Sequence, residues 1–132
     1  MMRKLLCIGL LMLPLMGWAN EGGGESSGPA IEYIEMKPKF TVNLVEPKKY
    51  LMANVQIMVE GEKEIEKVKK NMPAIKNALI MLYSGFSIAD LQTMEQREAL
   101  RVKTKDEIRN VLEKYANSDG FRDVFFTEFL LN

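Results

Sequence analysis

The sequence contains no histidine, and its one cysteine and one tryptophan, Cys7 and Trp18, both lie near the N-terminus. A cysteine/histidine zinc site, a cysteine or serine–histidine nucleophile and an internal disulfide all need side chains that this chain lacks. What remains is carboxylate chemistry, a serine–lysine pair or no catalysis. We expect no enzymatic activity, no cofactor and no metal site.

The sequence also lacks an excess of either charge, with 18 basic and 18 acidic residues. Nucleic-acid binding domains concentrate lysine and arginine on a strongly positive surface. The one lysine-rich run, Lys63–Lys70, is interrupted by glutamate, which is typical of a solvated helix face. We therefore expect no nucleic-acid partner.

The longest apolar run, Leu5–Met16, follows the basic pair Arg3 and Lys4 and precedes Gly17-Trp18-Ala19. A basic start, an apolar run and small residues before a cut are typical of a secretory signal peptide. A membrane anchor is the alternative, but a spanning helix needs about 20 apolar residues and this run contains Pro14. We expect residues 1–19 to be a signal peptide cleaved after Ala19, or else a short membrane anchor.

The segment that follows, residues 20–32, is rich in glycine and serine and poor in apolar side chains. Such a composition is typical of a flexible linker. Residues 33–132 are enough for one domain and not two. We expect this domain to lie outside the cytoplasm.

Two segments predict an antiparallel hairpin. Tyr50–Glu60 alternates strictly, with apolar residues at every second position, and residues 39–45 alternate over a shorter span. A period of two is the pattern of a half-buried strand. The turn residues of Glu46–Lys49 join the two strands.

Helical periodicity follows the hairpin in two places. The apolar residues of Glu62–Gly85 recur at spacings of three and four, and Pro73 predicts a break at Asn71–Met72. Thr93 and Gln96 have capping-box spacing ahead of a second helix, which we expect to run to about Ala116. The residues predicted for its inner face are Leu100, Thr104, Ile108, Val111, Leu112 and Tyr115.

The last segment, Phe121–Leu131, is aromatic and β-branched, which predicts a strand. Strict alternation places Val124 and Phe126 on one face and Phe125 and Phe129 on the other. A strand that is apolar on both faces is usually central or covered, so we expect it to pair with one of the hairpin strands. The predicted fold class is α/β (α+β): an antiparallel hairpin, two to three helices and a returning C-terminal strand.

Five sequence words in this order resemble a known family. The words are Pro38–Leu44 (PKFTVNL), Tyr50–Met52 (YLM), Met72–Ile80 (MPAIKNALI), Asp90–Thr93 (DLQT) ahead of Glu98–Leu100 (EAL), and Asp123–Phe129 (DVFFTEF). Together they resemble the periplasmic domain of the flagellar basal-body protein FliL over residues 33 to 131.

The resemblance implies a domain similar to the stomatin/prohibitin fold, a partner in the flagellar stator units, and self-assembly into rings. It implies a non-enzymatic role in modulating flagellar rotation and motility. Members of that family carry a full transmembrane helix, whereas this chain has a signal-like segment. The alternative is a soluble periplasmic scaffold domain of the same fold without a motor role, and in either case inner-membrane association at the basal body is possible.

The candidate interface residues are Asn43, Phe125 and Phe129. Phe125 and Phe129 belong to a strand whose second face must be covered by something, and Asn43 interrupts an apolar strand at an edge or partner-binding position. Core packing is the alternative for the two phenylalanines. A carboxylate hydrolase would need two converging acids; Asp123 and Glu128, five residues apart on the predicted strand, do not supply such a pair.

Overall fold

The computed structural model describes residues 29–132, so the predicted signal peptide and most of the predicted linker lie outside the described residues. Its elements in chain order are β1 (Ile31–Glu35), β2 (Phe40–Asn43), β3 (Tyr50–Glu60), α1 (Glu62–Lys70), α2 (Met72–Tyr83), the 3₁₀ turn η2 (Ile88–Leu91), α3 (Met94–Tyr115) and β4 (Phe121–Leu131). Strand β1 begins inside the predicted linker, because Ile31 and Glu32 pair with Glu60 and Val59 of β3.

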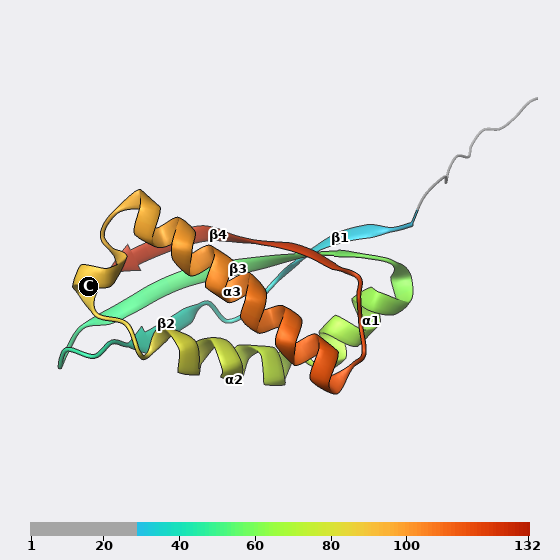
Figure 1. Cartoon of the computed structure of the whole chain (residues 1–132), viewed down its shortest axis with the longest axis horizontal. Helices are drawn as coiled ribbons and strands as arrows, with labels where there is room; N and C mark the ends of the chain where they lie inside the picture. Colours follow the sequence, from blue (N-terminus) through green and yellow to red (C-terminus); the bar gives the residue numbers. More distant parts are fainter. Residues whose placement is uncertain (1–28) are drawn as a thin grey trace, which may run out of the picture.

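Strand β3 is the centre of one antiparallel sheet (Figure 1). Strand β4 pairs along almost its whole length on one side, while β1 and β2 share the other side end to end. The predicted hairpin and the predicted pairing of the C-terminal strand with Tyr50–Glu60 are confirmed. The additional strand is β1, which was not separated from β2 by the sequence pattern; Pro38, which has no N–H to donate to a ladder, lies between them.

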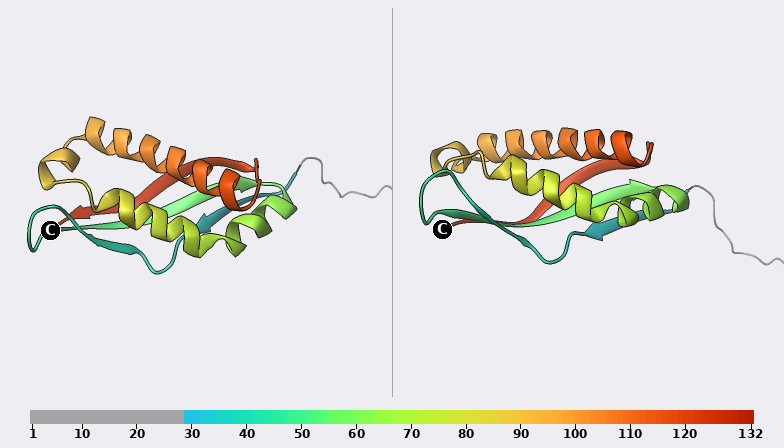
Figure 2. Two further views of the ribbon diagram at one scale, coloured as in Figure 1. Left: turned by 60° about the horizontal axis from the view of Figure 1, so that its bottom comes forward. Right: turned by 90° about the horizontal axis from the view of Figure 1, so that it is seen from below.

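All three α-helices lie on one face of the sheet, and no helix of the described chain covers the other face (Figure 2). The apolar residues of β3 point toward the helices and are completely buried, namely Leu51, Ala53, Val55, Ile57 and Val59. Helix residues Ile65, Val68, Ile75 and Leu79 meet them. The predicted match between the helical stripe and the alternating strand is therefore what forms the core.

The helix boundaries follow the predicted signals. Helix α1 ends at Lys70 and α2 begins at Met72, with Pro73 in the first turn of α2. Helix α3 begins after Thr93, whose side chain accepts a hydrogen bond from the Gln96 backbone at 3.0 Å, and the Gln96 side chain in turn accepts from the Thr93 N–H. The boundary between α1 and α2 and the start of α3 are thus both set by residues close in sequence.

The predicted inner face of α3 is buried from Leu100 to Leu112, but Tyr115 is 59% exposed. The prediction that Tyr115 lies on the inner face is wrong. At this end of α3 it is Ala116, the residue after Tyr115, that packs against the core.

Strand β4 contains two irregularities in its pairing with β3. Phe126 pairs with Val55 and Phe129 with Ala53, so Thr127 is an extra residue in the ladder. A β-bulge of this kind shifts the alternation by one position. The prediction that Phe125 and Phe129 share a face is therefore wrong: Phe129 lies on the helix-covered face beside Phe126, with ring centroids 5.2 Å apart.

A polar pair is buried between α2 and α3. The Tyr83 hydroxyl lies 2.8 Å from Thr104 Oγ1, which itself donates to the Leu100 carbonyl at 2.8 Å. Since the threonine hydroxyl has one proton, Tyr83 is the donor of the first bond. Burial raises the pKa of Tyr83.

Candidate functional site

The uncovered face of the sheet carries exposed apolar side chains. Ile31 and Tyr33 of β1 and Leu130 of β4 are each at least half exposed. Tyr33 faces the half-buried Phe125 across β3, with ring centroids 6.4 Å apart. Met58 is the direct β3 partner of Tyr33. We call four of these residues, Ile31, Tyr33, Met58 and Phe125, the open-face patch; Leu130, the partner of Met52, lies further along the same face.

A row of polar residues crosses the same face. Lys39, just before β2, and Glu128 of β4 form an ion pair at 2.7 Å across strand β3. Asn54 of β3 donates to Glu35 at 2.9 Å. The Asn54 Oδ1 atom is buried and accepts no hydrogen bond within residues 29–132. Leaving an acceptor unsatisfied is costly, so this row is the least well satisfied part of the described structure.

The structure places the three predicted interface residues in different surroundings. Asn43 is the last residue of β2, pairs with Tyr50 and is exposed. Phe125 belongs to the open-face patch, beside Tyr33. Phe129 lies on the other face, where the Arg97 guanidinium sits 4.7 Å from its ring centroid. The structure therefore does not bring the three together.

Sequence reasoning missed Tyr33 as a surface residue. The sequence Ile31–Glu35 (IEYIE) has apolar residues on both faces, so it does not show that Tyr33 points outward and Ile34 inward. Ile31 and Glu32 fall within the predicted linker of residues 20–32, so the sequence predicts neither the separate strand β1 nor its outward side chains.

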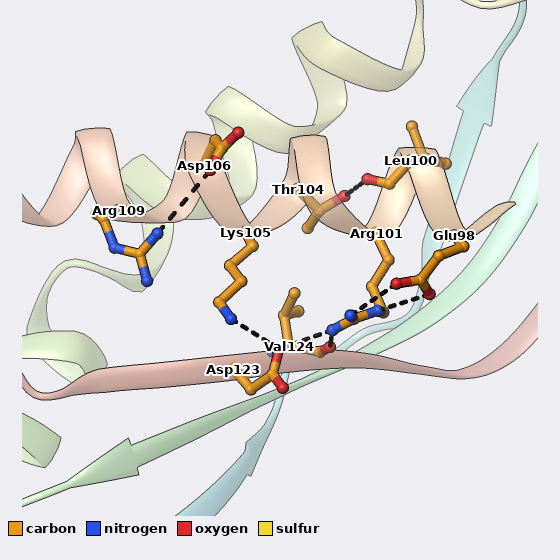
Figure 3. Close-up of polar contacts among 9 residues, drawn as sticks. All are labelled: Glu98, Leu100, Arg101, Thr104, Lys105, Asp106, Arg109, Asp123 and Val124. Carbon is orange, nitrogen blue, oxygen red and sulfur yellow. Dashed lines mark hydrogen bonds and ion pairs between the residues drawn. The ribbon is translucent and has the colours of Figure 1, made fainter. Parts of the chain in front are cut away.

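Helix α3 is tied to β4 by an ionic network around Arg101 (Figure 3). The Arg101 guanidinium donates to both carboxylate oxygens of Glu98, at 3.0 and 2.8 Å, to Asp123 Oδ1 at 2.7 Å and to the Val124 carbonyl at 3.1 Å. Lys105 lies 3.5 Å from the same Asp123 oxygen. This pairing depends on a helix–strand approach that no local sequence pattern reveals.

The network keeps its acids ionised. The hydrogen bond from Arg101 lowers the pKa of Glu98. Desolvation opposes the ionisation of Asp123, but the Val124 N–H, Arg101 and Lys105 together outweigh it and lower the pKa of Asp123. Asp123 is bound to α3 while Glu128 is bound to Lys39, so the two acids do not form a converging catalytic pair.

A polar hollow of about 670 Å³ lies between α1, the C-terminal end of α3 and the loop before β4. Its basic residues already have acidic neighbours: Lys67 lies 3.6 Å from Glu64, and Arg122 donates to Glu60 at 2.8 Å. Glu64 also accepts a hydrogen bond from Ser118, which lowers the pKa of Glu64. The hollow therefore presents compensated charge rather than an unpaired catalytic or anion-binding group.

Within residues 29–132, no group of three or more acidic, cysteine or histidine side chains is arranged to hold a metal ion. No helix in that part of the chain is long and apolar enough to cross a membrane. The features that remain are the open-face patch and the long strand β4.

These features define a two-layer α/β domain, in which helices cover one face of an antiparallel sheet and leave the other face open. The chain belongs to the family of the flagellar basal body-associated protein FliL, which matches residues 33–131. It is similar to the flagellar protein FliL of Aquifex aeolicus strain VF5, with 30% identity over 99 residues that cover 74% of this chain and 59% of that relative. The chain therefore spans about three-fifths of the relative's length, and its family supports a flagellar role.

Proposed function

We propose that this protein is a non-enzymatic accessory of the flagellar basal body that binds the stator units, assembles with copies of itself, or does both. By these contacts it modulates flagellar rotation and motility from the periplasm, in association with the inner membrane. Membership of the FliL family supports the flagellar part of this proposal. The open-face patch supports the part that concerns binding.

The patch carries the proposal because its apolar side chains have no cover in the described chain. The Tyr33 side chain is 54% exposed and the Ile31 side chain 51% exposed, although both lie in strand β1 of the sheet. Contiguous exposed apolar side chains with a polar surround mark interaction sites in soluble domains. Aromatic residues and methionine, such as Tyr33, Phe125 and Met58, are also enriched in protein interfaces.

The test is a chromosomal replacement that carries Tyr33→Ser together with Phe125→Ser. We expect the variant to accumulate as a folded protein but to behave like a deletion strain in swimming speed and in recruitment of fluorescent stator units. Tyr115→Ser is the matched control, because Tyr115 is also an exposed tyrosine but lies on α3. A deletion strain with unchanged swimming, swarming and stator recruitment would refute the proposal.

The second candidate is a periplasmic scaffold domain of the same fold without a motor role. The signal-like segment at the N-terminus favours it, because that segment is shorter than a spanning helix. Crosslinking that consistently recovers another periplasmic protein and never a stator component would favour this second candidate.

A further inference from the structure

The two long edges of the sheet are built differently. One edge consists of the short strands β1 and β2, of 5 and 4 residues, with Pro38 between them. The other is β4, a single strand of 11 residues that pairs, within the described chain, with β3 alone. An unpaired strand edge presents backbone N–H and C=O groups to which another strand can add. Strand β4 is therefore the longer template.

The backbone of β4 alternates between groups that face β3 and groups that face away. Tyr50 and Asn132 exchange both backbone hydrogen bonds, each at 3.0 Å. Because bonded and non-bonded pairs alternate in an antiparallel ladder, Leu131 and Phe129 direct their N–H and C=O groups away from β3. Val124 does the same on the far side of the bulge.

In the half of this edge around Val124, side chains of the same domain bind the outward backbone groups. The outward N–H of Val124 donates to Asp123 Oδ1 at 2.9 Å, and its outward carbonyl accepts from Arg101 at 3.1 Å (Figure 3). The described residues provide no equivalent contact to the backbone of Phe129 or Leu131. The half from Phe126 to Leu131 is therefore left open.

A hollow of about 360 Å³ lies where the open half begins, at Phe125 and Phe126. Its lining residues are Met94, Arg97, Glu98, Arg101, Phe125 and Phe126. Phe125 and Phe126 point to opposite faces of β4, so the hollow opens at the strand edge itself. Met94 on its rim is 84% exposed. The hollow is large enough and apolar enough for one side chain of a bound strand.

The charge of the hollow is not balanced. Glu98 and Arg101 compensate each other through two hydrogen bonds. Arg97 donates through Nε to the Leu91 carbonyl at 3.2 Å, and it forms no ion pair with any residue of the described chain. One positive charge in the lining of the hollow therefore has no acidic partner within residues 29–132, and it favours an acidic group there.

We infer that the Phe126–Leu131 edge binds an extended segment of another protein as a fifth strand of the sheet. The backbone bonds supply affinity, an apolar side chain enters the hollow, and an acidic side chain pairs with Arg97. A second copy of this chain suits the edge less, because two β4 strands side by side would bring two unpaired Arg97 side chains to one seam. The inference goes beyond the proposed function, since it concerns backbone pairing at the strand edge; the hollow and the open-face patch share Phe125, which none of the variants below changes.

The test begins with selection of twelve-residue random peptides on the immobilised full chain. We expect the enriched peptides to alternate apolar and polar residues and to carry an acidic residue. The best peptide is then measured against four proteins: the natural sequence, Arg97→Ala, Met94→Glu and the control Arg109→Ala. Arg109 is matched to Arg97, because both are arginines of α3 that lie over a phenylalanine of β4.

We expect Arg97→Ala to weaken binding about tenfold, which is the size of one lost charge-assisted contact. We expect Met94→Glu to weaken it by a similar factor, because it places a carboxylate at the hollow that repels the acidic side chain of the peptide. Arg109→Ala is expected to leave the affinity unchanged. We expect the Met94→Glu variant to fold, because Met94 is the first residue of α3 and an acidic residue is favourable in the first turn of a helix.

Hydrogen exchange measured by NMR identifies the binding mode. The peptide is expected to slow exchange of the Phe129 and Leu131 amides, which are free in the unbound domain. Failure to enrich alternating acidic peptides, equal weakening by Arg97→Ala and Arg109→Ala, or unchanged exchange of these amides would each overturn the inference. Concentration-dependent protection of the same amides without peptide would also overturn it, and would assign the edge to a second copy.

Discussion

The buried pair Tyr83–Thr104 predicts an unusual order of mutant stabilities. Thr104 donates to the Leu100 carbonyl and accepts from Tyr83, and both side chains are completely buried. Tyr83→Phe removes one hydrogen bond and leaves the threonine proton still bonded, so we expect a loss of about 1 kcal/mol. Thr104→Val keeps the shape of the side chain but leaves the tyrosine O–H buried without an acceptor, which costs about 2 to 3 kcal/mol.

The double variant Tyr83→Phe/Thr104→Val removes both polar partners at once. No donor is then left unsatisfied, and we expect a total loss of about 1 kcal/mol, which is less than the loss from Thr104→Val alone. The assay is urea unfolding of the four proteins under one set of conditions, with the free energy of unfolding extrapolated to water.

The comparison of the two single variants with the double variant tests whether Tyr83 donates its hydrogen bond to Thr104. If Thr104→Val costs no more than Tyr83→Phe, the tyrosine does not depend on threonine as its acceptor. If the losses from the two single variants simply add in the double variant, the two hydroxyls are not coupled, and the assignment of donor and acceptor is wrong.

Three further predictions concern the core, the α3–β4 network and the loop before β4. Because burial raises the pKa of Tyr83, the unfolded chain ionises first, so stability falls as the pH rises above the ordinary tyrosine value of about 10; Tyr83→Phe should lose less stability over that range in alkaline urea titrations. The pKa of Asp123 is lowered, so its contribution is present above the ordinary value of about 3.9 and is lost as the pH falls below it. Asp123→Asn should therefore be about 1 kcal/mol less stable at pH 7, with a difference that shrinks on acidification, and a constant difference would contradict this. Gly120→Ala should lower the free energy of unfolding by about 1 to 3 kcal/mol, because the added Cβ would lie 2.3 Å from Glu64 Cβ. The control is Gly85→Ala, whose added Cβ would have its nearest contact at 3.7 Å. This control should unfold at nearly the same urea concentration as the natural protein.

Much of the fold could be predicted because the signals are local. The alternation of β3 is unbroken, so its buried face is specified by sequence alone. The break at Pro73 and the capping box at Thr93 follow from the missing N–H of proline and from a short-range side-chain bond. Each of these features depends on residues within a few positions of one another.

The candidate interface could be predicted only in part, because it depends on pairing between distant segments. The bulge at Thr127 moves Phe129 to the helix-covered face, and nothing in the sequence of β4 shows at which residue its pairing with β3 will shift. The contact of Arg101 with Asp123 likewise requires the helix and the strand to be in position. Phe125 lies on the face that the helices do not cover, and its role at an interface stays a prediction.

The proposal that this domain works through its open-face patch is tested most directly by site-specific photocrosslinking in the living cell. A benzophenone amino acid is placed at position 125 in one strain and at position 115 in another, and the crosslinked proteins are identified by mass spectrometry. We predict that position 125 crosslinks to a stator component or to a second copy of this chain, and that position 115 crosslinks to neither. Crosslinks to these proteins from position 115 alone, or to no flagellar protein from position 125, would contradict the account.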